Sequence, residues 1–91
     1  MLIISEAKRA KRSVTLRLEG RVVGPWVGEL RQICEPFVSD GRKLSLDLAE
    51  VSFADEIGLA LLASLRERGV KLSSVTPFVE EQLRTAGSPA K

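Results

Sequence analysis

The chain has 91 residues, a formal net charge of +2, no histidine and one cysteine. This length suits one domain, residues 1–91, with a single core and no deep substrate cavity. The absent histidine and the lone Cys34 exclude metal sites built on clusters of those residues, histidine-activated nucleophiles and an internal disulfide. We therefore expect a protein without a metal or cofactor.

Residues 1–13 are expected to form a first strand, over residues 2–4, followed by a basic loop. The loop holds Lys8, Arg9, Lys11 and Arg12. Such a run is either a solvated loop or a contact for phosphate or an acidic partner. No aromatic residue separates these charges, so we expect no nucleic-acid binding by base stacking. We also expect a cytoplasmic protein with no membrane insertion, because the N-terminus does not resemble a signal peptide and no apolar run is long enough to span a bilayer.

Two segments, residues 14–19 and 44–48, alternate between apolar and polar side chains, which predicts half-buried strands. Pro25 suits the first turn of a helix whose apolar residues recur at helical spacing up to Val38, and Pro36 is expected to bend its last turns. In that helix, Cys34 is expected to be a small core residue.

Asp55 is a good N-cap for a second helix over residues 56–68, which Gly69 ends. A strand over residues 70–75 and a helix over residues 77–87 follow, and residues 88–91 are expected to form a loose tail. Early strands followed by alternating strands and helices predict an α/β domain. Its sheet should be mixed and four-stranded, with helices packed mainly on one face.

The segment from Leu46 to Leu59, LDLAEVSFADEIGL, resembles the central motif of STAS domains, the fold of bacterial anti-sigma factor antagonists. The family pattern has an apolar strand ending in Asp-Leu, a Val and a Phe in the turn, and Asp-Ser-Ser-Gly-Leu at the helix start. The resemblance covers most of residues 14–83. It implies a STAS-like fold and a non-catalytic regulator of transcription whose partner is a serine kinase that also binds a sigma factor.

This chain departs from the family pattern at the residue that is phosphorylated in antagonists. Asp55 and Gly58 match the motif, whereas Glu56 stands at the phospho-acceptor position and Ile57 replaces the next serine. The resemblance therefore implies that the usual serine switch is lost. Glu56 is either a favourable helix-start residue or a permanent, imperfect copy of the phosphorylated state.

Helical spacing predicts which face of helix 56–68 is free for a partner. Five residues are expected to face the sheet: Ile57, Gly58, Leu61, Leu62 and Leu65. The start and outer face of the helix are expected to bind the partner, through Asp55, Glu56, Leu59, Ala60 and Ala63. The alternative is that another helix covers this face.

Two classes of partner remain open. The first is an anti-sigma factor or serine kinase, and the second is a transporter subunit, since STAS-like domains also occur in anion- and lipid-transport systems. Family members usually continue with another strand and helix, so the chain is expected to be C-terminally shortened. An exposed edge at residues 70–75 then predicts a possible homodimer.

Overall fold

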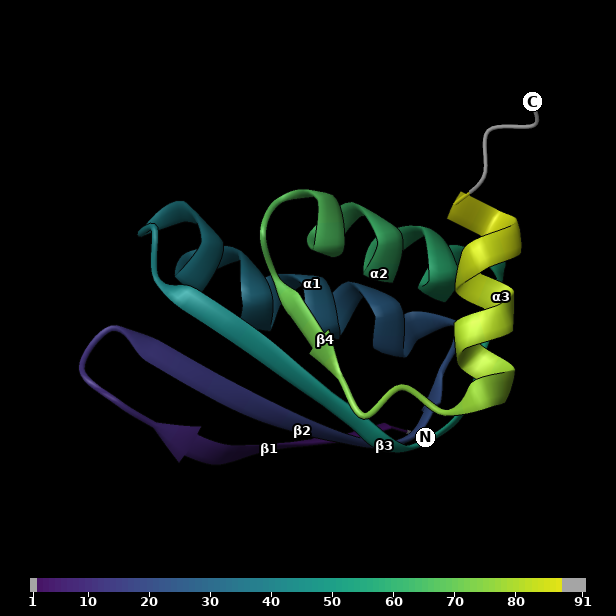
Figure 1. The fold of residues 1–91 in the computed structure, drawn as a ribbon, viewed down its shortest axis with the longest axis horizontal. Helices are drawn as coiled ribbons and strands as arrows, with labels where there is room; N and C mark the ends of the chain where they lie inside the picture. The colour runs from purple at the N-terminus through teal and green to yellow at the C-terminus, as the bar shows by residue number, and fades with distance from the viewer. Residues whose placement is uncertain (1, 88–91) are drawn as a thin grey trace.

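The computed structural model describes residues 2–87, with side chains described up to residue 84. The predicted loose tail, residues 88–91, lies outside the described residues. A four-stranded sheet carries its helices on one face (Figure 1). The elements in chain order are β1 (Leu2–Arg9), β2 (Ser13–Val22), α1 (Pro25–Ser39), β3 (Lys43–Ala54), α2 (Glu56–Glu67), β4 (Lys71–Ser73) and α3 (Pro77–Gly87).

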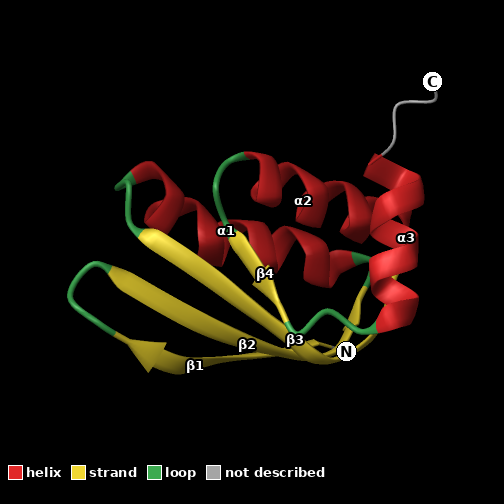
Figure 2. Cartoon of the chain, in the orientation of Figure 1, coloured by secondary structure: helices red, strands yellow, loops and turns green. Residues whose placement is uncertain are grey.

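The strands lie side by side in the order β1-β2-β3-β4 (Figure 2). β1 and β2 form an antiparallel hairpin, whereas β2 pairs with β3, and β3 with β4, in parallel. The parallel pairs are joined through α1 and α2, as crossover connections require. The predicted mixed α/β sheet is therefore confirmed.

The core lies between the sheet and the helices. Leucines and valines at alternate positions of β2 and β3 face the helices, because successive strand residues point to opposite faces. α1 contributes the fully buried Cys34, α2 contributes Leu62, and α3 contributes Leu83. No polar or charged residue is buried in the part of the chain whose side chains are described.

All four strands differ in extent from the sequence predictions, and β2, at Ser13–Val22, is longer than predicted at both ends. β1 continues to Arg9, because it pairs with β2 along its length, so Lys8 and Arg9 belong to a strand rather than to a loop. β3 was predicted to end at residue 48 but continues to Ala54, because β2 pairs with it up to that point. β4 is shorter than predicted and pairs only with residues 45–47 of β3.

α1 continues past Pro36, the residue expected to bend its last turns, and ends at Ser39. Its last turn is completed by the amide of Asp40, which donates to the carbonyl oxygen of Pro36 at 3.0 Å. Phe37 and Val38 pack against the core, and this packing holds the turn despite the hydrogen bond that proline cannot make.

Candidate functional site

The start of α2 is fixed by the side chain of Asp55. One carboxylate oxygen accepts a hydrogen bond from the amide of Gly58 at 2.7 Å, which caps the helix as predicted. The other accepts the amide of Gly24 at 3.0 Å, at the start of α1. One carboxylate therefore joins the first turns of both helices.

These two backbone donors also determine the charge state of the carboxylate. The hydrogen bond from Gly24, followed by that from Gly58, lowers the pKa of Asp55, because both bonds favour the ionised form. Both oxygens of Asp55 are thus already used inside the fold. Asp55 therefore serves mainly to position the two helix starts, and its oxygens are less available to a partner.

Gly58 lies against the end of β2. A Cβ atom at this position would be 2.2 Å from the carbonyl oxygen of Val22, so the backbones approach more closely here than any side chain allows. The same carbonyl accepts the amide of Asp55 at 3.2 Å. This close approach leaves no room for a side chain, so the motif position requires glycine.

The face of α2 that is open to solvent differs from the predicted one. Leu59 was expected to be exposed but is only 8% exposed, and Ile57 was expected to be buried but is 59% exposed. Three elements contact this helix, namely β3 of the sheet, α1 and α3. The contact with α3 extends the buried side of α2 to include Leu59. The covering helix considered as an alternative is thus present. Glu56 and Ala60 are exposed and Ala63 is half-buried.

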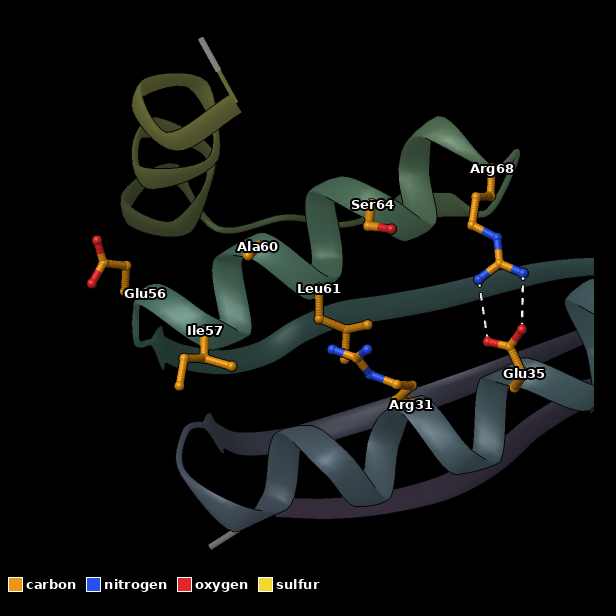
Figure 3. Close-up of a pocket in the computed structure, with 8 residues that line it drawn as sticks. All are labelled: Arg31, Glu35, Glu56, Ile57, Ala60, Leu61, Ser64 and Arg68. Carbon is orange, nitrogen blue, oxygen red and sulfur yellow. Dashed lines mark hydrogen bonds and ion pairs between the residues drawn. The ribbon is translucent and has the colours of Figure 1, made fainter. Parts of the chain in front are cut away.

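The exposed side of α2 forms a groove with α1, with a volume of about 350 Å³ (Figure 3). Across its far end the guanidinium of Arg68 donates two hydrogen bonds to the carboxylate of Glu35, at 3.0 and 3.2 Å. The hydrogen bond from Arg68 lowers the pKa of Glu35. The groove is lined by Arg31 and Glu35 from α1, and by Glu56, Ile57, Ala60, Leu61, Ser64 and Arg68 from α2 and its C-cap.

A second hollow, of about 590 Å³, lies on the other side of the same helix start. It is lined by Phe53, Ala54, Asp55, Glu56, Leu59, Phe78, Glu81 and Gln82. Sequence reasoning missed both concavities, because each joins residues from elements far apart in the chain. Ile57 carried a usable signal, being an apolar residue where the motif has serine.

Within the described residues no group of three or more candidate ligands could hold a metal ion. None of the helices in this part of the chain has the length and apolar character needed to cross a bilayer. The main surface feature of the site is the exposed face of α2, which has a concavity on each side.

Comparisons with known proteins agree with the fold. A protein-family model described as "Mlab, STAS domain" matches residues 5–88. The structure of the anti-sigma factor antagonist SpoIIAA in its unphosphorylated form is similar, with a TM-score of 0.73 and 16% identity over 90% of this chain and 82% of that chain. The crystal structure of Mglu is similar over 77% of this chain, with a TM-score of 0.57 and 23% identity, although the match spans only 18% of that chain. No curated protein sequence matches significantly.

Proposed function

The chain belongs to the STAS domain family, and we propose that it is a non-catalytic module of the cytoplasm that binds another protein through the start and outer face of α2. The observation that carries the proposal is the exposed Ile57 on that face, beside the groove between α1 and α2. STAS domains of the anti-sigma factor antagonist type are non-catalytic regulators, and the likeness to SpoIIAA supports the same class here.

The chemistry of the face suits docking. Ala60 is exposed and Ala63 half-buried, and side chains this small let the backbone of a partner come close. Ile57 supplies an apolar anchor, and the Glu35–Arg68 pair forms a polar rim. An apolar centre with a polar rim is the usual composition of a protein–protein interface. We therefore replace Leu59 by Ile57 in the proposed contact set and retain Glu56, Ala60 and Ala63.

We further propose that this module works without the serine switch. Glu56 occupies the position that is phosphorylated in antagonists, and a carboxylate cannot accept phosphate from a serine kinase. Incubation with a cognate kinase and labelled ATP should leave the start of α2 unlabelled. Label at Ser52, which is exposed near the end of β3, would instead indicate that the switch has moved.

Site-specific crosslinking in native cells tests the proposed surface. A photoreactive amino acid at Ala60 should give an adduct with one partner protein, whereas the same amino acid at Ser5, which is exposed on β1, should not. Adducts at neither position, or equally at both, would contradict the proposal. The identity of the adduct separates an anti-sigma factor or kinase from the alternative, a transporter subunit.

A further inference from the structure

The hollow between α2 and α3 has an aromatic wall. Phe53, from the end of β3, and Phe78, from the start of α3, stack with ring centroids 6.3 Å apart and an angle of 25° between the rings. Phe53 is 36% exposed and Phe78 is 56% exposed. They are two of only four large hydrophobic side chains exposed among the described residues, so an apolar patch is concentrated at this point.

All the charged residues of the lining are acidic, although the chain as a whole carries a net charge of +2. Asp55, Glu56 and Glu81 line the hollow, and no lysine or arginine does. Asp55 is occupied by the two backbone amides, and Glu81 pairs with Arg84 at 3.4 Å. Glu56 is exposed and has no ion pair within residues 2–84, so its charge is available to a cation.

Gln82 contributes an unsatisfied acceptor. Its side-chain Nε2 donates to the carbonyl oxygen of Ala54 at 3.3 Å, which fixes the amide and leaves Oε1 buried without a partner among the described residues. A buried acceptor without a hydrogen bond is costly, so a ligand that supplies an N–H donor would gain by satisfying it.

We propose that this hollow receives an arginine side chain of the partner protein. A guanidinium is flat and can lie on the ring of Phe78, and it is always positive and can pair with Glu56. It also carries several N–H donors, which match the unsatisfied Oε1 of Gln82. A lysine ammonium lacks the flat surface, and an aliphatic side chain would leave the glutamine unsatisfied. This inference rests on the proposed function, because it names the chemistry by which the same partner is recognised.

The probe is N-acetyl-arginine N-methylamide, which reproduces an arginine within a protein chain. In an NMR titration of the isotope-labelled protein, we expect the largest shifts at the side-chain amide of Gln82 and the backbone amides of Ala54 and Leu59. The equivalent citrulline compound has a similar shape but no charge, and should shift these signals far less. Free arginine should bind more weakly than the capped compound, since its α-carboxylate is repelled by the acidic lining.

Matched variants locate the contact. Phe78→Ala should weaken binding of the arginine compound by about two- to fivefold, the range for an exposed cation–aromatic contact. Ile3→Ala should leave it unchanged, because Ile3 is 50% exposed on β1 but lines neither concavity. Equal shifts with citrulline, or largest shifts outside the hollow, would overturn the inference. If free arginine bound more tightly than the capped compound, the arginine would not come from a partner protein and the inference would be overturned.

The two proposals fail separately. An adduct at Ala60 with no titration signal in the hollow would keep the proposed function and remove the arginine contact. If both experiments succeed, Phe78→Ala should also lower the yield of the adduct, whereas Ile3→Ala, at an exposed apolar residue of β1, should not. An unchanged yield with Phe78→Ala would place the partner elsewhere and overturn the inference.

Discussion

Replacing Gly58 by alanine places a methyl group against the end of β2. The added Cβ would lie 2.2 Å from the carbonyl oxygen of Val22, 3.0 Å from a methyl carbon of the same residue and 3.2 Å from a carboxylate oxygen of Asp55. The nearest atom belongs to the backbone of a central strand and cannot turn aside as a flexible side chain would. The first turn of α2 must therefore move away from β2.

Two opposing effects set the size of the change. Alanine is the better helix former, by about 1 kcal/mol per residue. Overpacking a tight contact costs about 1–3 kcal/mol or more, and here the displacement also stretches the hydrogen bond from Gly58 to Asp55. Because the clash involves two backbone segments, we expect the cost to exceed the gain. The free energy of unfolding should fall by about 2 kcal/mol, and Tm by roughly 10 °C.

Urea unfolding followed by circular dichroism measures this change, and the chain offers a matched control. Gly28 is an exposed glycine within α1, and a Cβ added there meets nothing within 4 Å. Gly28→Ala should therefore raise the free energy of unfolding by about 0.5–1 kcal/mol. If Gly58→Ala also stabilised the protein, the close approach of α2 to β2 would not be a constraint and the reasoning would be refuted.

Four further predictions follow from the same contacts. The pKa of Asp55 is lowered in the folded protein, so its contribution to stability is complete above the unfolded pKa, near 3.9, and is lost as pH falls through the lower folded pKa. The difference in the free energy of unfolding between wild type and Asp55→Asn should therefore shrink below roughly pH 4. Leu59→Arg should lower the free energy of unfolding by about 3 kcal/mol or more because the site is buried, whereas Ala60→Arg should change it by less than about 0.5 kcal/mol. Equal changes for the two variants in chemical denaturation would contradict the burial of Leu59. Burial raises the pKa of the Cys34 thiol to about 11, so iodoacetamide at pH 8 should modify the native protein roughly 100-fold more slowly than the protein in urea, and equal rates would exclude a buried thiol. The edge strand β4 predicts a homodimer, and a single species at the 9.9 kDa monomer mass in sedimentation equilibrium would remove that idea.

The residues that determine local structure were sufficient to predict the element order. Alternating leucines placed β2 and β3, Pro25 placed the start of α1, and Asp55 with Gly69 delimited α2 to within one residue. These signals work because they depend on neighbours in the sequence, through a side-chain period, a cap or a chain reversal. The same signals identified the core, since the inward positions of both strands are buried.

The exposed face of α2 could not be predicted in the same way. Helical spacing tells which residues share a face, but the direction of that face depends on every layer that packs against the helix. α3 covers Leu59, and Ile57 is left exposed on the opposite side. The stacking of Phe53 on Phe78 is likewise a contact between residues 25 positions apart (78 − 53), which no local pattern signals.

The position of Glu56 connects the two candidate contact surfaces. It is exposed in the first turn of α2 and lines both the groove toward α1 and the hollow toward α3. A partner that spans the start of α2 would meet this side chain whichever concavity it entered first. In an antagonist with serine here, phosphorylation would add about 1.5 to 2 negative charges at this shared edge. If the proposed function is right, the one constant charge of glutamate would favour a permanent interaction with a basic partner over a switched one.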